Sequence, residues 1–130
     1  MNEGSFNCLL RYVINMTKYP LNIHKNYHAH VYFEEQTLQF AKDLCHNAGK
    51  LFNLDVGKFH QKPIGPHPKW SCQLKFTSTD FEQFIPWLNS QREELIVLVH
   101  GVTGNNLQDH TDYAYWLGNE VPLNLAIFQQ

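Results

Sequence analysis

Apolar and polar positions follow two different periods along the chain, and these periods predict alternating strands and helices. In residues 70–76 every second position is apolar, which is typical of a half-buried strand. In residues 34–50 the apolar positions recur every three or four residues, which is typical of an amphipathic helix. The complete prediction is four strands (27–33, 52–59, 70–76 and 95–100) and two helices (34–50, and from a cap at Ser78 or Thr79 through Leu88).

Residues that disfavour regular structure separate or interrupt these elements. Lys62–Lys69 contains three Pro and one Gly and is expected to be irregular. Pro86 should kink the second helix or mark its true start, because it removes one backbone hydrogen bond. Gly101–Gly118 is predicted to be a loop with one helical turn, and Leu123–Phe128 a last strand or an amphipathic tail.

The order strand, helix, strand, strand, helix, strand predicts a ferredoxin-like α+β fold. In this fold both helices cover one face of an antiparallel sheet, and the bare face is usually covered by a partner or an extra segment. A chain of 130 residues has the size of a single domain. We expect residues 1–26 to be an N-terminal extension, either flexible or a strand added at a sheet edge, and residues 27–130 to form the domain.

Composition narrows the functional classes. With a formal net charge of -2, the chain lacks the basic excess that is typical of nucleic-acid-binding proteins. A net charge this close to zero, together with a bare sheet face, predicts a homodimer. Three cysteines without a CxxC motif indicate a reducing compartment and predict a cytoplasmic location. No apolar run approaches the length of a membrane span, and Cys8–Ile14 does not match a secretory signal, so no membrane association is expected.

Histidine is the unusual component of the chain, with eight copies. Because side chains alternate along a strand, His28, His30 and Tyr32 should share the bare face if Ala29 and its alternate neighbours face the helices. By the same argument Ser71, Gln73 and Lys75 join that face. The first and last strands are antiparallel neighbours in this topology, so His100 should lie beside His28.

Two further histidines are candidates for the same face. His110 follows Asp109 and could be an acid–base group or a ligand; alternatively Asp109 caps a helix and His110 is exposed. His67 lies between two prolines, and it reaches the face only if its loop folds back or a partner subunit supplies it. His24, His46 and His60 are expected to be exposed or in loops, without a function.

The residues alone therefore predict a histidine-rich site for a divalent metal on an open sheet. Two His and one carboxylate form the facial triad of non-haem iron enzymes, but no carboxylate occupies an obvious third position here. Three histidines would serve zinc or iron equally well. Oxygen chemistry and Lewis-acid chemistry both remain open at this point.

Several motifs follow one another in a distinctive order: Tyr27–Phe33, Pro63–Pro68, Trp87–Leu88 with Arg92 and Leu95, Val97–His100 with Thr103–Gly104, Asp109–His110 and Trp116–Gly118. Taken together, over about residues 27–125, they resemble the small DOPA 4,5-dioxygenase family of fungi and bacteria. The resemblance implies a ferredoxin-like fold and extradiol cleavage of a catechol such as L-DOPA, with non-haem Fe(II) and O2. One departure is Gly101, where the family pattern has Pro after the histidine; this loosens the expected loop.

Carried onto this chain, the resemblance assigns His28, His30 and His100 to the iron. His110 or His67, with Tyr32 as a third candidate, would take a catechol proton. The candidates for substrate binding are Arg92, Trp116, Gln73, Trp87 and Tyr115. Arg92 has an alternative interpretation as a solvated cation at a helix end, and the aromatic residues as ordinary core or interface.

Two other functions stay open on the sequence. One is a non-catalytic ferredoxin-like dimer that binds a small aromatic molecule or a metal ion. The other is a metal-dependent hydrolase or isomerase built on the same histidines. Consumption of oxygen separates the dioxygenase from both.

Overall fold

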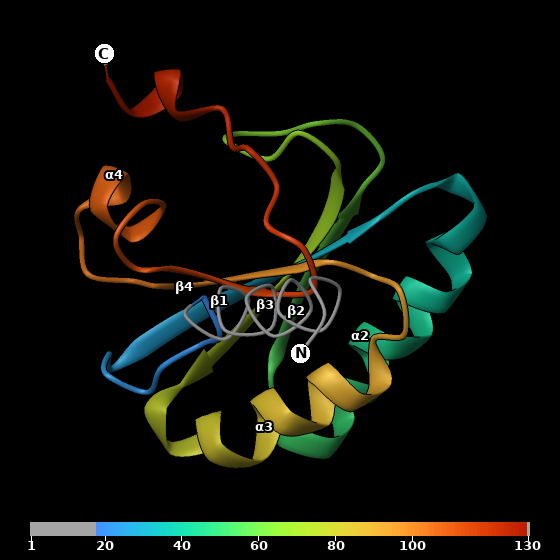
Figure 1. Cartoon of the computed structure of the whole chain (residues 1–130). Coiled ribbons are helices and arrows are strands. Elements are labelled where there is room, and N and C mark those ends of the chain that lie inside the picture. Colours follow the sequence, from blue (N-terminus) through green and yellow to red (C-terminus); the bar gives the residue numbers. More distant parts are fainter. Residues whose placement is uncertain (1–17, 130) are drawn as a thin grey trace, which may run out of the picture.

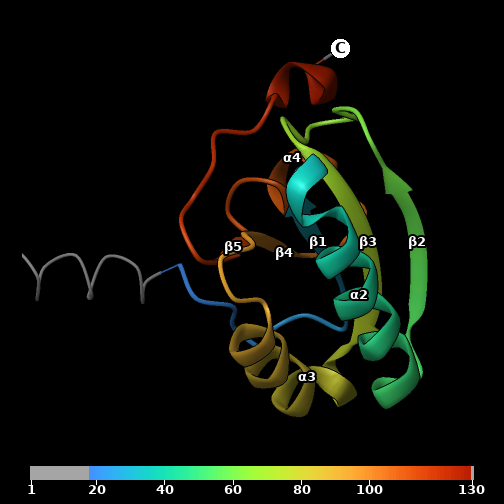
Figure 2. The same ribbon diagram turned by 90° about the vertical axis from the view of Figure 1, so that its right-hand side faces the viewer.

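A computed structural model describes residues 18–129 of the chain, so that most of the predicted N-terminal extension lies outside the described residues. Five antiparallel strands form one sheet in the order β2-β3-β1-β4-β5, and β2 and β5 lie at its two edges (Figure 2). The strands are β1 (Asn26–Phe33), β2 (Asp55–His60), β3 (Trp70–Thr77), β4 (Val97–Gly101) and β5 (Ala114–Leu117). The first four strands have the ferredoxin-like order, which confirms the predicted fold.

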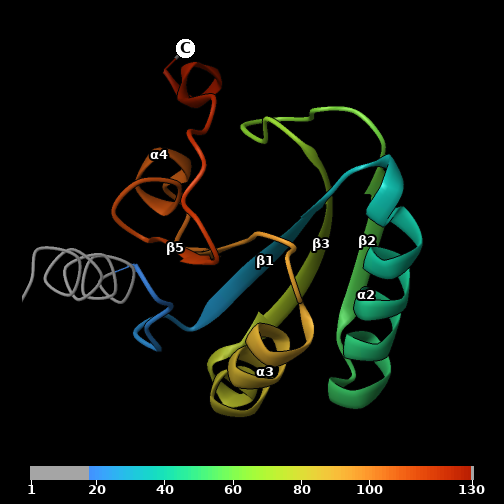
Figure 3. The ribbon, with the colours of Figure 1, turned by 45° about the vertical axis from the view of Figure 1, so that its right-hand side comes forward.

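Helices cover one face of this sheet, as predicted (Figures 1 and 3). They are α2 (Leu38–Phe52), preceded by the short 3-10 helix η1 (Glu35–Thr37), and α3 (Ser78–Gln91). The opposite face carries the β2–β3 loop, α4 (Asn106–Asp109) and a C-terminal segment that ends in η2 (Leu125–Phe128) (Figure 1). The face that the sequence predicted to be bare is therefore partly covered by segments of the same chain.

The main core lies between the sheet and its two helices because the inward positions of the strands are apolar. From β1 it takes Ala29, Val31 and Phe33, which confirms the predicted facing of that strand. A smaller apolar cluster on the opposite face contains Tyr32, Leu98, Ala114 and Trp116. The two clusters together fix the sheet from both sides.

Four details differ from the sequence prediction. Phe52, predicted to start the second strand, is the last residue of α2, and that strand begins at Asp55. Residues 114–117, predicted as loop, form β5, in which all four residues are buried and pair with β4. A strand of four residues is too short to show a periodic pattern in the sequence. Leu125–Phe128 forms a 3-10 helix rather than a strand. The cap of α3 is Thr77, whose extended backbone (φ −120°, ψ 171°) precedes the first helical residue, and Pro86 lies inside the helix rather than at its start.

The chain before β1 is attached to the sheet edge. The Trp116 amide donates to the Lys18 carbonyl at 2.8 Å, and the Tyr27 hydroxyl donates to the Leu21 carbonyl at 2.9 Å. These two bonds hold residues 18–25 beside β5 and β1. Between residues 18 and 129, no helix combines the length and the apolar character that crossing a bilayer requires.

Candidate metal centre

Five histidines gather on the sheet face opposite α2 and α3, and we call them the histidine cluster. His28 and His30 come from β1, His100 from β4, His67 from the β2–β3 loop and His110 from the residue after α4. His30, His67 and His100 are buried, whereas His28 and His110 are half-buried. The alternation of β1 and the neighbouring position of β4 thus bring the three predicted metal ligands to one place.

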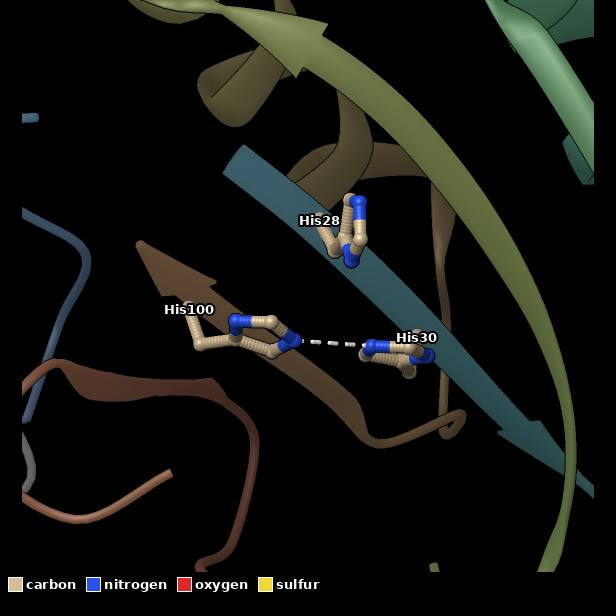
Figure 4. Close-up of side chains that lie close together, drawn as sticks. All are labelled: His28, His30 and His100. Carbon is tan, nitrogen blue, oxygen red and sulfur yellow. Dashed lines mark hydrogen bonds between the residues drawn. The ribbon is translucent and has the colours of Figure 1, made fainter. Parts of the chain in front are cut away.

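The three strand histidines form the compact centre of the cluster (Figure 4). His28 and His100 are directly paired across β1 and β4. The Nε2 atoms of His30 and His100 are 3.0 Å apart, and one nitrogen from each of the three rings lies within 4.8 Å of the others. Such a set of imidazole nitrogens could hold one divalent ion, and it suits zinc, iron, copper or nickel better than magnesium or calcium.

In two of the rings, a hydrogen bond to a backbone carbonyl determines which nitrogen carries the proton and which keeps a lone pair. His100 Nδ1 donates to the Gly101 carbonyl at 2.8 Å, and His110 Nδ1 donates to the Asn106 carbonyl at 2.7 Å. A carbonyl only accepts, so in each neutral ring Nδ1 carries the proton and Nε2 keeps a lone pair. His100 can therefore ligate through Nε2, and His110 can accept a proton there.

His67 reaches the cluster because its loop folds back over the sheet. Its amide donates to the Ile64 carbonyl at 3.0 Å, and the Asn124 amide of the C-terminal segment donates to the Pro66 carbonyl at 2.9 Å. The His67 ring consequently lies 4.1 Å, centre to centre, from that of His30. Of the two routes open on the sequence, folding back of the loop is the one the structure shows.

Tyr32 fixes the other side of His67. Its hydroxyl lies 2.8 Å from His67 Nδ1, and burial raises the pKa of the phenol well above its ordinary value. A phenol that keeps its proton donates a hydrogen bond to Nδ1, so the neutral His67 ring carries its own proton on Nε2. His67 and His110 therefore present opposite groups, a donor and an acceptor, beside the same centre.

Burial keeps the cluster neutral. It lowers the pKa of His67 to about 4 and that of His100 to about 3, and it holds the pKa of His30 well below its ordinary value. The neighbouring rings add to the effect, because each would repel a second positive charge. A neutral imidazole is the form that binds a metal ion, so His30 and His100 could ligate one at neutral pH.

Asp109 does not cap a helix, as one interpretation of the sequence had it. It is buried at the end of α4, and its carboxylate accepts hydrogen bonds from the Thr103 hydroxyl at 2.6 Å and from the Thr103 amide at 2.9 Å. The helix cap is Asn105 instead, whose side chain accepts from the Gln108 amide. The role of Asp109 is thus to close the loop that presents His110.

The remaining predicted residues divide between the two faces. Trp116 packs edge-on against Tyr32, and Gln73 pairs with His30 across β1 and β3, so both share the face of the cluster. Arg92 donates instead to Asn89 and to the Leu95 carbonyl, in the connection before β4 begins. The helix-end interpretation of Arg92 fits these contacts.

Two other aromatic candidates lie on the helix side of the sheet. Trp87 packs against Phe52 and Phe84, and Tyr115 belongs to the main core. Phe128, which no sequence pattern predicted, also lies at the cluster, with its ring 4.7 Å from that of His110. No local pattern marks Phe128, because only the path of the C-terminal segment brings it there.

Known proteins resemble this chain in sequence and in structure. A protein of Amanita muscaria named DOPA 4,5-dioxygenase is 31% identical over 111 residues, which are 78% of this chain and 49% of that protein. An uncharacterised 21.2 kDa protein of Botryotinia fuckeliana is 33% identical over 113 residues, covering 78% of this chain and 62% of the relative. The chain thus spans about half to three-fifths of the length of these curated relatives.

A crystal structure from Nostoc punctiforme, described as a candidate dioxygenase, has the same fold. It superposes with a TM-score of 0.79 at 38% identity and covers 82% of this chain and 93% of that one. The sequence pattern of the Dopa 4,5-dioxygenase family matches residues 27–127, which include all five histidines of the cluster. The chain therefore belongs to the Dopa 4,5-dioxygenase family.

Proposed function

We propose that this protein is an extradiol ring-cleaving dioxygenase that acts on a catechol such as L-DOPA, with non-haem Fe(II) and O2. One observation carries the proposal: His28, His30 and His100 converge within 4.8 Å of one another, in a chain of a family named for a dioxygenase. The three histidines would hold the iron. Bound there, iron would supply Lewis acidity toward the catechol oxygens and redox capacity toward O2.

His110 and His67 would handle the protons. His110 Nε2 carries a lone pair because Nδ1 is bound to the Asn106 carbonyl, so this atom would accept a proton from a catechol hydroxyl. His67 Nε2 carries a proton because Tyr32 donates to Nδ1, so His67 would donate to an oxygen of the substrate. Tyr32 acts by holding the His67 ring and its tautomer in place.

The surroundings would orient an aromatic ring. Trp116 and Gln73 lie on the same face as the cluster, one on each side of it, on β5 and β3. Burial of His30 and His100 excludes water from the deep side of the site. We also propose that the protein acts in the cytoplasm as a homodimer, on the grounds of its cysteine content and low net charge.

Oxygen uptake tests the function. The Fe(II)-loaded protein is mixed with L-DOPA, and oxygen consumption is followed together with the visible spectrum. We expect uptake with a yellow product, lost in His28→Ala and in His30→Ala. His46→Ala is the matched control, because His46 is exposed on α2 and packs against Phe59 instead.

Three results would contradict the proposal. Failure to bind iron would overturn the metal centre. Binding of iron and of catechols without oxygen uptake would favour the non-catalytic alternative. Full activity in both histidine variants would show that the ligands are assigned wrongly.

A further inference from the structure

A groove of about 430 Å³ begins at His110 and runs between β5 and the C-terminal segment. Its volume is in the range of small-molecule sites in proteins. Most of its lining is apolar: Ala114, Trp116, Val121, Pro122, Leu123 and Leu125. The groove is continuous with the histidine cluster, because the His110 ring lies 4.2 Å from that of His100.

Two opposite charges border this apolar groove, Lys18 and Glu120. The Lys18 backbone is fixed, since its carbonyl accepts the Trp116 amide at 2.8 Å, and Trp116 is itself a wall of the groove. Both side chains are exposed. The ion pair found among residues 18–129 joins Lys69 to Glu34, so within that range neither Lys18 nor Glu120 is neutralised by another side chain.

We propose that this groove binds the substituent of the catechol ring, with Lys18 receiving a carboxylate and Glu120 an ammonium group. The inference rests on the proposed function, because it places the ring at the histidine cluster. From there a substituent passes His110 and meets apolar walls, which suit its methylene carbons. The two charges at the border then suit the two charges of an amino-acid head group.

Lys18 therefore takes the place that the sequence analysis gave to Arg92. The guanidinium of Arg92 is bound to Asn89 and to the Leu95 carbonyl, whereas Lys18 lines the groove that starts at the cluster. No sequence motif marks Lys18, since it precedes the family match, which begins at residue 27. Its position is set by a contact far away in the sequence, the backbone hydrogen bond between its carbonyl and β5.

Four catechols separate the two charges experimentally. L-DOPA carries both, 3-(3,4-dihydroxyphenyl)propionate only the carboxylate, dopamine only the ammonium, and 4-ethylcatechol neither. Initial rates of oxygen uptake are measured with the Fe(II)-loaded full chain and with Lys18→Met and Glu120→Gln. The matched controls are Lys50→Met and Glu35→Gln, which remove exposed charges on the helix side of the sheet.

We expect Lys18→Met to raise KM about threefold to fivefold for the two carboxylate substrates, relative to the other two, as for a solvent-accessible ion pair. Glu120→Gln should raise KM by a similar factor for the two ammonium substrates, relative to the two substrates without an ammonium group. Equal changes for all four substrates, or no change, would overturn this inference alone. If the wild-type protein consumes no oxygen with any of the four, the proposed function fails, and the inference fails with it.

Discussion

The Nε2 atoms of His30 and His100 lie 3.0 Å apart, although 70 positions separate the two residues in the sequence. His100 Nδ1 donates to the Gly101 carbonyl, so His100 Nε2 is the acceptor in this contact. The shared proton then belongs to His30 Nε2. A metal ion bound by both rings would have to replace that proton, so under the proposed function metal binding and proton release are coupled.

Removal of any one of the three strand histidines should weaken metal binding. We expect one equivalent of Zn(II) or Co(II) per chain, and a loss of affinity of more than about 100-fold in His28→Ala, His30→Ala and His100→Ala, because each variant loses a ligand. Titration calorimetry measures the affinity, and circular dichroism checks the fold. His60→Ala is the control, since His60 lies on the edge strand β2; equal losses there would contradict the assignment.

Stability of the metal-free protein should fall as the solution becomes acidic. The pKa values of His67 and His100 in the folded protein, about 4 and about 3, lie below the ordinary value of 6.5. The folded state therefore binds fewer protons than the unfolded state. Keeping these histidines neutral therefore contributes to the free energy of unfolding in full above pH 6.5. That contribution is lost as the pH falls toward the folded-state pKa values, by up to about 1.4 kcal/mol per pH unit for each histidine.

Urea unfolding at pH 7.5, 6.0 and 5.0 measures this dependence. Between pH 6 and pH 5, His67→Gln should reduce the pH dependence of the free energy of unfolding by the equivalent of about one bound proton. This holds whatever its effect on the absolute free energy of unfolding. A stability that stays constant from pH 7.5 to pH 5.0 would show that the histidines are not buried as described.

Gly101→Ala should destabilise the end of β4. A Cβ at this position would lie 2.7 Å from two carbons of the His24 ring, and that ring is held by the Tyr115 hydroxyl at 2.8 Å from its Nε2. We expect a loss of about 1–3 kcal/mol in the free energy of unfolding. Metal affinity should also fall, because the Gly101 carbonyl orients His100.

The double variant Gly101→Ala with His24→Ala provides the control. Removal of the ring makes room for the methyl group, so the two effects on stability should be less than additive. Additive losses would mean that His24 does not limit position 101. The Gly101 amide also donates to the Tyr113 carbonyl at 3.2 Å, a hydrogen bond that a proline at this position could not make.

Tyr32→Phe should lower kcat for oxygen uptake substantially while it lowers the free energy of unfolding only modestly. The variant loses the hydrogen bond to His67 Nδ1, which costs about 1 kcal/mol of stability, but it also frees the His67 ring and tautomer. We expect kcat to fall about tenfold or more with little change in KM. Tyr115→Phe is the matched control, because its hydroxyl bonds His24 on the helix side; equal effects on kcat would contradict a specific role for Tyr32.

Patterns in the sequence were enough to predict the fold and the convergence of the three strand histidines. Alternation placed His28, His30 and Tyr32 on one face of β1, and the antiparallel pairing of β1 with β4 placed His100 opposite His28. The first follows from the alternation of neighbouring side chains along a strand, and the second from the strand order of the ferredoxin-like topology. The short strand β5 escaped prediction because four residues are too few to establish a period.

The sequence by itself therefore determined the ferredoxin-like core and the three strand histidines, because strand alternation and strand order are local or topological properties. Only the tertiary structure decided which other groups join them. His67 is brought to the cluster by the β2–β3 loop and Phe128 by the C-terminal segment, and the Asn124 amide joins these two segments by donating to the Pro66 carbonyl. Arg92 is turned away by hydrogen bonds to its own neighbours. The conformation of such segments follows from packing and hydrogen bonding between distant residues, which leave no periodic trace in the chain.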